Sequence, residues 1–242
     1  MGTIYGSDTA SVYHDFYRER NGKSYAAEAR HVAKLVRERR PGTAASLLDV
    51  ACGTGSHLET LVEEFERVEG LELSQAMLDV ARPLLPGVPL HQGDMRDFDL
   101  GRRFDAVVCM HSSIGYVGDE SALRRTLSRL AAHLEPGGVL VIEPWWSPDS
   151  FRDRHVAGDV LTVGGRTISR VSHTVRTNDR TRMEVHWVVA DPEEGPRHTV
   201  EAHVLTLFEP EQYRAAFEAA GCTVERLGTD WSRLGLYVGV RR

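Results

Sequence analysis

The sequence predicts an α/β protein built on a doubly wound, mostly parallel sheet, with a small antiparallel sheet inserted late in the chain. Three observations carry this prediction. Apolar runs of strand length alternate with helix-like stretches from Leu47 to Glu143, as in a parallel sheet. The first run ends in a glycine turn. Between residues 155 and 208 the pattern changes to a two-residue alternation, which is typical of antiparallel strands with one covered face.

The chain therefore divides into three segments. We expect residues 1–154 to form an N-terminal cap and the first part of the α/β domain. Residues 155–208 would form the antiparallel insertion and roof the substrate pocket, because ligands bind at that end of a doubly wound sheet. Residues 209–242 return to the α/β domain through a helix from Glu209 to Ala219 and two strands, Thr223 to Leu227 and Gly235 to Val240.

Before the first strand, residues 1–24 are polar and rich in tyrosine. Ser24 can cap a helix that runs to about Arg39, because a serine hydroxyl accepts from the free backbone N–H groups of the first turn. Asp119 can cap a helix from Glu120 to His133 in the same way.

The run Leu47-Leu48-Asp49-Val50-Ala51-Cys52-Gly53-Thr54-Gly55 predicts a buried parallel strand, a glycine turn and a helix that begins near Ser56. Gly53 and Gly55 can adopt backbone conformations closed to other residues, and they let a ligand lie against the main chain. A second apolar run, Val68 to Leu71, ends in Glu72. A carboxylate at that place can accept both hydroxyls of a ribose, so we expect an adenosine-containing cofactor.

The glycine turn does not fit a dinucleotide. The dinucleotide fingerprint needs a third small residue, where this chain has Leu58. The turn, Glu72, the later segment Gly93-Asp94-Met95, the strand Phe104 to Met110 and the turn from Leu134 to Leu140 together resemble the class I methyltransferases that use S-adenosylmethionine (SAM). This resemblance implies SAM as cofactor, S-adenosylhomocysteine as product and an antiparallel last strand. An NAD-linked dehydrogenase is the weaker alternative.

Within the insertion, Val171, His173 and Val175 alternate with Arg170, Ser172 and Thr174. We place the first three on the covered face. Two further alternating runs start at Met183 and Val200.

Composition restricts the class of protein. The chain has 242 residues, a net charge of −6 and a pI of about 6.0, so it lacks the overall basic field of a nucleic-acid-binding protein. Its three cysteines are isolated, which favours reduced thiols and a cytoplasmic protein. We expect no membrane span. The histidines show no metal-ligand spacing, so we expect no metal.

A narrower resemblance rests on motifs outside the glycine turn. These motifs are Gly70 to Ser74, His91 to Phe98, Ser112-Ser113-Ile114-Gly115, Glu143-Pro144-Trp145-Trp146, Arg170-Val171-Ser172-His173 and Met183-Glu184-Val185-His186. They resemble the TDP-3-amino-sugar N-methyltransferases, which make dimethylamino sugars such as desosamine and mycaminose. The resemblance runs from about Tyr5 to Val240 and allows a homodimer. It implies one or two methyl transfers to the amine of a TDP-linked deoxysugar used for an antibiotic or related natural product.

The resemblance also assigns roles to residues. It places Tyr5 and Tyr116 near the amine as the candidate catalytic residues. The predicted cofactor residues are Tyr13, Tyr25, Asp49, Ala51, Gly53, Gly55, Glu72, Leu73, Met77, Asp94, Met95 and Met110. The predicted nucleotide-sugar residues are Trp145, Arg170, Ser172, His173 and Arg182. Guanidinium groups in the insertion suit a diphosphate on an otherwise acidic protein.

Plainer interpretations stay open for several of these residues. Trp145 can close the core, Arg170 and Ser172 can lie on a solvated strand face, and His173 can be a hydrogen-bonded core histidine. The segment Asp230 to Tyr237 departs from the family pattern, and Trp231 is new there. The main alternative is a SAM-dependent N- or O-methyltransferase of another small metabolite; a SAM-binding module without activity is a second.

Overall fold

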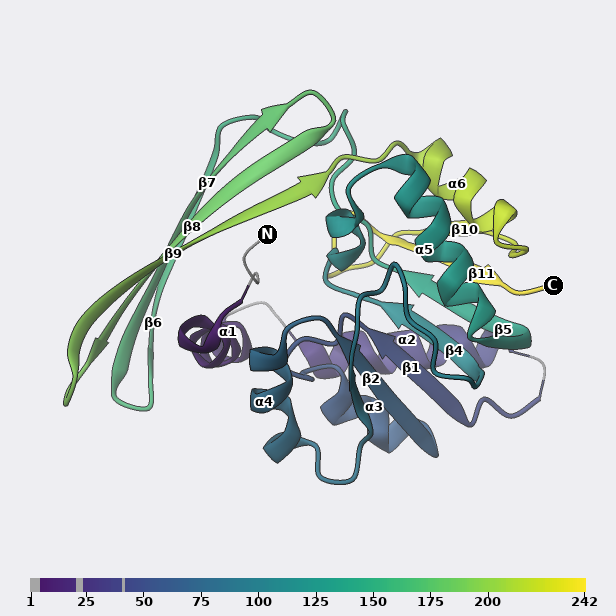
Figure 1. Cartoon of the computed structure of the whole chain (residues 1–242), viewed down its shortest axis with the longest axis horizontal. Helices are drawn as coiled ribbons and strands as arrows, with labels where there is room; N and C mark the ends of the chain where they lie inside the picture. Colours follow the sequence, from purple (N-terminus) through teal and green to yellow (C-terminus); the bar gives the residue numbers. More distant parts are fainter. Residues whose placement is uncertain (1–4, 21–23, 41) are drawn as a thin grey trace.

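The computed structural model describes residues 5–20, 24–40 and 42–242. Its centre is a seven-stranded sheet in the order β10-β11-β5-β4-β1-β2-β3 (Figure 1). Only β11 runs antiparallel to its neighbours, as predicted for the last strand. The strands are β1 (Ser46–Val50), β2 (Arg67–Glu72), β3 (Leu90–Gln92), β4 (Phe104–Cys109), β5 (Leu134–Ile142), β10 (Glu225–Leu227) and β11 (Leu236–Val240).

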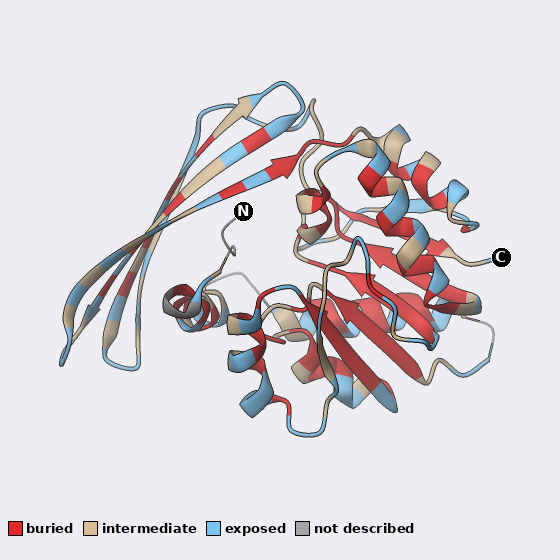
Figure 2. Ribbon diagram, viewed as in Figure 1, coloured by how far each residue is buried: buried red, intermediate tan, exposed pale blue. Residues whose placement is uncertain are grey.

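Helices cover both faces of this central sheet, because its strands carry apolar side chains on both faces. Val107 and Cys109 pack in one core with α5 (Glu120–Ala132) and α6 (Pro210–Ala219). Ala106 and Val108 pack in the other with α2 (Tyr25–Arg39), α3 (Leu58–Glu64) and α4 (Gln75–Leu84). The central strands are buried along almost their whole length (Figure 2). The predicted doubly wound α/β fold is therefore confirmed.

Two predicted helix caps form. Ser24 Oγ accepts from Ala27 N at 3.3 Å at the start of α2, and Asp119 Oδ1 accepts from Ala122 N at 2.8 Å at the start of α5. Each cap satisfies one of the free N–H groups of the first helical turn.

A second sheet, here called the insertion sheet, extends from the central domain on one side (Figure 1). It has four antiparallel strands in the order β6-β7-β8-β9. They are β6 (His155–Val163), β7 (Arg166–Thr177), β8 (Arg180–Asp191) and β9 (Gly195–Thr206). The polypeptide enters β6 after β5 and leaves β9 for α6, so the insertion sheet lies between the fifth and sixth strands of the central sheet.

The N-terminal helix α1 (Ser7–Glu19) lies against the insertion sheet. Val12 and Phe16 pack with Ile168, Val185 and Trp187 in a third apolar core. Ion pairs add to this contact: Arg20 Nε lies 2.9 Å from Asp159 Oδ2, and Arg166 pairs with Asp15. The sequence interpretation treated this region only as a polar, tyrosine-rich cap and did not include the helix.

The predicted covered face of β7 is wrong. Arg170, Ser172 and Thr174 are buried, whereas Val171 is 49 % exposed and His173 is also exposed. The two-residue alternation was correct, but the polar set faces α1 and the central domain. Burial of apolar side chains stabilises the fold, but all side chains on one face of a strand are buried together. In β7 the buried face is the one that borders the pocket, and it carries the polar residues.

Within the described part of the chain, no helix is long and apolar enough to cross a membrane.

Candidate active site

The site begins where β1 and β2 end side by side. Glu72, the last residue of β2, turns its carboxylate back onto the glycine turn. Its Oε2 accepts from Gly53 N at 3.0 Å, and its Oε1 accepts from Ser74 N at 2.8 Å. Each oxygen keeps a second lone pair for a ligand. Burial raises the pKa of Glu72, although these backbone hydrogen bonds partly oppose the rise.

The two glycines of the turn have different tasks. Gly53, at φ 57°, lies in the pocket lining and presents its backbone there. Gly55, at φ 82°, is not part of the lining. A φ of 82° strains any side chain other than glycine, and a Cβ at Gly55 would also lie 2.4 Å from Leu85 Cδ1 at the end of α4, so this position favours glycine for its backbone conformation.

Asp49 lies on β1 with only 1 % of its surface exposed. Its Oδ2 accepts no hydrogen bond from any residue that the structure describes. Burial raises the pKa of Asp49 to about 7, with His57 opposing and Glu72 adding to the rise. A buried carboxylate oxygen without a partner, at the wall of a pocket, is suited to a cationic ligand group.

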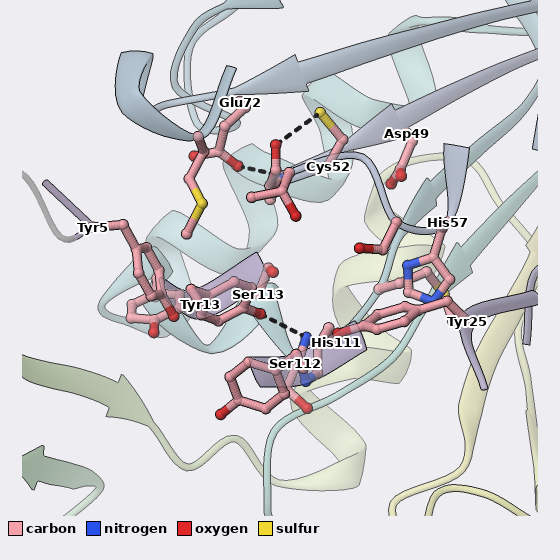
Figure 3. Close-up of a pocket in the computed structure, with 18 of the residues that line it drawn as sticks. Tyr5, Tyr13, Tyr25, Asp49, Cys52, His57, Glu72, His111, Ser112 and Ser113 are labelled. Carbon is pink, nitrogen blue, oxygen red and sulfur yellow. Dashed lines mark hydrogen bonds between the residues drawn. The ribbon is translucent and has the colours of Figure 1, made fainter. Parts of the chain in front are cut away.

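Tyrosines from the N-terminal region form one wall of the pocket (Figure 3). The rings of Tyr5 and Tyr13 meet edge-to-face at 5.1 Å, and Tyr13 and Tyr17 lie 4.5 Å apart. Tyr25 meets the ring of His57 at 4.9 Å. Ser74 Oγ donates to the Tyr5 carbonyl at 2.8 Å, which holds Tyr5 over the pocket in a left-handed conformation of φ 65°.

Strained backbone lies next to the tyrosines, where Tyr13 contacts His111 (Figure 3). His111 and Ser112 follow β4 with φ values of 54° and 61°, which non-glycine residues rarely adopt. Glu143 Oε2 accepts from His111 N at 2.8 Å, and the Tyr13 hydroxyl lies 3.1 Å from His111 Nδ1. Such conformations cluster at binding and catalytic sites, where the surroundings enforce them.

The insertion sheet contributes the roof. Arg170 is 8 % exposed and lines the pocket with Met183 and Leu205. Among the described residues its guanidinium contacts Ser172 Oγ at 3.1 Å, Met183 Sδ at 3.6 Å and the face of Trp187 at 5.8 Å, and none of these is an anion. Its Nε has no hydrogen-bond partner in that part of the chain. This buried, unneutralised cation fits an anionic ligand.

Trp145 and Tyr116 connect the roof to the central domain. Trp145 Nε1 donates to Thr181 Oγ1 of β8 at 3.2 Å. Tyr116 belongs to the 3₁₀ turn η1 (Ser113–Val117), and its hydroxyl lies 2.9 Å from His203 Nδ1 of β9. Both residues line the pocket.

The structure brings together most of the predicted residues. The lining includes Tyr5, Tyr13, Tyr25, Asp49, Ala51, Gly53, Glu72, Met77, Met110, Tyr116, Trp145 and Arg170. Ser172 is buried behind the lining, where it supports Arg170.

Other predicted residues lie outside the lining. Leu73 is 57 % exposed. Asp94 and Met95 follow β3 at the same edge as Glu72, where Gly93 N donates to the Glu72 carbonyl at 3.0 Å. Asp94 pairs with Arg96, whose hydrogen bonds lower the Asp94 pKa.

Two of the substrate assignments are not supported by position. His173 is exposed, on the face of β7 opposite Arg170, because successive strand residues point to opposite sides. Arg182 is exposed on β8, where Nη1 lies 3.0 Å from Glu184 Oε2, so its charge is already paired. The segment Asp230 to Tyr237 contributes nothing to the lining, and Trp231 packs against His31 at 4.7 Å.

Sequence reasoning missed several residues of the site: Tyr17, Arg20, His57, His111, Met183 and Leu205. His57 and His111 each lie a few residues beyond a strand that the sequence did predict. Loops in this position commonly carry functional residues, so their place after a strand could have identified them as candidates. Met183 and Leu205 could not be found in this way, because only the docking of the insertion sheet brings them to the pocket.

The residues fit the two ends of SAM. The orphaned Asp49 oxygen suits its ammonium group, and the Glu72 oxygens suit its ribose hydroxyls. Among residues 5–20, 24–40 and 42–242, no cluster of three or more His, Cys, Asp or Glu side chains is arranged to hold a metal ion.

Comparison with known proteins agrees with this geometry. Residues 47–138 match the model of a methyltransferase domain. The chain is 55 % identical over 237 residues to dTDP-3-amino-3,4,6-trideoxy-alpha-D-glucopyranose N,N-dimethyltransferase from Streptomyces venezuelae, covering 98 % of this chain and 99 % of that protein. It is 47 % identical to dTDP-4-amino-2,3,4,6-tetradeoxy-D-glucose N,N-dimethyltransferase from Saccharopolyspora spinosa, covering 99 % and 95 %.

A solved structure extends the likeness to three dimensions. SAM-bound CalS10, an amino pentose methyltransferase from Micromonospora echinaspora involved in calicheamicin biosynthesis, matches with a TM-score of 0.85 and 45 % identity over 100 % of both chains. With this identity over almost its whole length, the chain is a SAM-dependent methyltransferase and belongs to the dTDP-amino-sugar N-methyltransferases of class I.

Proposed function

We propose that this enzyme transfers one or two methyl groups from SAM to the amine of a dTDP-linked 3-amino deoxysugar in the biosynthesis of an antibiotic or related natural product. The observation that carries the proposal is a single pocket with opposite charges on its two walls. Asp49 and Glu72 come from the central sheet, and the unneutralised Arg170 comes from the roof. A cationic cofactor and an anionic nucleotide sugar are ligands of those two kinds.

Asp49 and Glu72 would bind the cofactor at its ends. The free Asp49 oxygen would face the ammonium group, and the two Glu72 oxygens would accept hydrogen bonds from the ribose hydroxyls while they hold the glycine turn. Tyr13, Tyr25 and Met77 would enclose the cofactor, since all three line the same pocket. Asp94 and Met95 would reach the adenine from the rim, next to Glu72, and Leu73 would lie beside them.

Arg170 would bind the diphosphate. Its guanidinium is buried, Ser172 and Trp187 fix its orientation, and Nε still has a hydrogen bond to give. A planar guanidinium suits two phosphate oxygens at once. Trp145 would pack beside the sugar or the base, because it lines the pocket next to the roof.

When bound, SAM supplies a methyl group on a positively charged sulfur that a neutral amine can attack. The protein mainly has to align the amine and exclude water, and alignment can contribute about 7–11 kcal/mol to lowering a barrier. The tyrosine rings that line this side of the pocket would exclude water there. Tyr5 and Tyr116 would orient the amine through their hydroxyls, and both phenols are buried, which raises their pKa values.

Mass spectrometry of the purified enzyme with SAM and dTDP-linked amino deoxysugars tests the proposal. The expected result is a product heavier by one or two methyl groups with the 3-amino sugar. A parallel reaction with the 4-amino isomer shows whether the enzyme prefers an amine on carbon 3 or on carbon 4. If only free metabolites without a nucleotide are methylated, the proposal is wrong. A thermal shift with TDP alone gives an independent check, because a ligand of the native state stabilises it.

We also propose a cytoplasmic enzyme that acts as a homodimer and binds no nucleic acid. In support of a dimer, the outer face of the insertion sheet exposes apolar side chains, which a second copy would bury: Val156, Val160, Val171, Val188, Val200 and Val204. Sedimentation equilibrium of the wild type and of Val160→Lys tests this, and a monomeric wild type contradicts it.

A further inference from the structure

Behind Tyr116 lie the buried His203 and the partly buried Glu201, which the function above does not use. His203 is 2 % exposed on the inner face of β9. Its Nδ1 lies 2.9 Å from the Tyr116 hydroxyl, and its Nε2 lies 3.7 Å from Glu201 Oε2. Tyr116, His203 and Glu201 thus form a chain of contacts from the pocket lining into the insertion sheet.

Glu201 is fixed from two other elements. Its Oε1 accepts from Thr9 Oγ1 of α1 at 2.7 Å, and its Oε2 accepts from Trp187 Nε1 of β8 at 3.0 Å. Burial alone would raise the Glu201 pKa, but the nearby His203 ring and the hydrogen bonds from Thr9 and Trp187 outweigh it and hold the pKa below its usual value. Glu201 is therefore a carboxylate at neutral pH.

This carboxylate decides the tautomer of His203. An ionised carboxylate can only accept hydrogen bonds, so it favours a proton on the nearby Nε2. Nδ1 is then the unprotonated nitrogen and accepts from the Tyr116 hydroxyl. The other groups around the His203 ring are the phenol of Tyr5, whose ring lies 5.2 Å away, and Met183, its register partner on β8. The charge beyond Met183 is that of Arg170.

Tyr116 by itself is a poor base. Burial raises the pKa of its phenol, so it stays protonated at neutral pH. A protonated phenol can take up the proton of an amine only if it passes its own proton on. Each methyl group gained by the amine nitrogen requires the loss of one proton, so a group that receives this proton has a defined task.

We propose that His203, held by Glu201, is the proton acceptor behind Tyr116 in the methylation reaction, and this inference rests on the proposed function. Before each transfer, an N–H bond of the protonated substrate amine breaks as an O–H bond forms at Tyr116, which frees the lone pair that attacks the methyl group. The original O–H bond of Tyr116 breaks as an N–H bond forms at His203 Nδ1. The carboxylate of Glu201 stabilises the resulting imidazolium. Tyr116 touches the substrate, whereas His203 and Glu201 act through it as positioning residues.

The first test needs no substrate. ¹⁵N NMR of the histidine-labelled enzyme reports the tautomer of each imidazole, and His203→Gln identifies the His203 signal. We expect a proton on Nε2 and a hydrogen-bonded, unprotonated Nδ1, and a change in the Nδ1 shift in Tyr116→Phe. A proton on Nδ1 in the neutral ring would overturn the relay.

The second test is the pH profile of kcat with a dTDP-linked amino sugar. His203→Gln should lower kcat at pH 7 by about 100-fold, near the lower end of general acid–base effects. The loss should shrink toward pH 9, where more of the amine is already neutral. His198→Gln is the matched control, because His198 lies exposed on the same strand. It should keep the wild-type profile.

Three outcomes separate this inference from the function on which it rests. A His203→Gln enzyme with the same loss at every pH, or with none, would overturn the relay while wild-type turnover upholds the proposed function. The double variant His203→Gln/Tyr116→Phe should have a kcat no lower than that of the slower single variant, because the two residues act in one path. A kcat that falls by the product of the two single losses would overturn the relay. A wild type that methylates no dTDP-linked amino sugar would overturn the function and the relay together.

Discussion

The proposed role of Asp49 predicts that cofactor binding depends on pH. Its carboxyl is 1 % exposed, and burial raises its pKa to about 7. In the free enzyme at pH 7 it is therefore about half protonated. If it pairs with the cofactor's ammonium group, as proposed, it must be ionised in the complex. Binding then releases a proton, and affinity rises with pH until Asp49 is ionised in the free enzyme as well.

The size of the effect follows from that pKa of about 7. Well below it, each unit of pH costs a factor of ten in the dissociation constant, or about 1.4 kcal/mol. Relative to its plateau at high pH, the affinity should therefore be about 10-fold lower at pH 6 and about 100-fold lower at pH 5. Glu72, whose pKa is also raised, adds a smaller loss in the same direction.

The stability of the free enzyme should change in the opposite direction. The folded pKa of Asp49, about 7, lies above the ordinary aspartate value of 3.8, so the folded state binds the proton more tightly. The free energy of unfolding therefore falls as the pH rises from about 3.8 to about 7. Above this range the stabilisation from the protonated Asp49 is lost. Asp49→Asn should be more stable than the wild type at pH 8 by at most about 4 kcal/mol, and should bind the cofactor more weakly.

Titration calorimetry with S-adenosylhomocysteine between pH 5 and 8 measures the affinity. Two buffers of different ionisation enthalpy at each pH give the number of protons released. Asp49→Asn is the control, and it should keep only the Glu72 part of the pH dependence. An affinity that is constant over this range in the wild type, or a slope that Asp49→Asn leaves unchanged, would refute the assigned role.

Three further predictions follow from other contacts. Glu72→Gln should weaken S-adenosylhomocysteine binding about 10- to 100-fold, because a hydrogen bond to a charged group contributes about 1.5–3 kcal/mol. Calorimetry measures this loss, and Asp94→Asn, measured in the same way, should show a smaller one. Arg170→Met should raise KM for the nucleotide sugar at least about 10-fold, with a smaller change in kcat; steady-state kinetics with Arg182→Met, whose charge is exposed, provide the comparison, and equal effects would contradict the assignment. Asp119→Ala should lower the free energy of unfolding through loss of the α5 cap, seen as a lower midpoint in a urea titration, while kcat and KM in the activity assay stay unchanged.

The sequence by itself determined the central sheet and the cofactor half of the pocket. The apolar run through Val50 fixed β1, and the carboxyl ends of parallel strands meet at one edge, so Asp49, Gly53 and Glu72 had to lie close together. The caps at Ser24 and Asp119 are equally local, because a cap depends on a side chain and the backbone three residues away.

Only the tertiary structure decided the roof. A two-residue alternation defines two faces of a strand but does not say which neighbour covers each face. The rule that apolar residues lie inside placed Val171 and His173 on the covered side, whereas α1 and the pocket cover Arg170 and Ser172 instead. Burying the guanidinium costs free energy, which a bound anion can offset, and this cost cannot be seen in a pattern of apolar residues.

The same reason explains why Glu201 and His203 were missed. They are far in sequence from Thr9 and Tyr116, and neither belongs to a motif. Their contacts exist because α1 packs on the insertion sheet through Phe16 and Trp187, and because β9 reaches η1 beside the pocket. Local sequence thus fixed the strands, turns and caps, whereas the docking of one sheet on another fixed which polar groups meet, because that contact is made between residues that no local pattern connects.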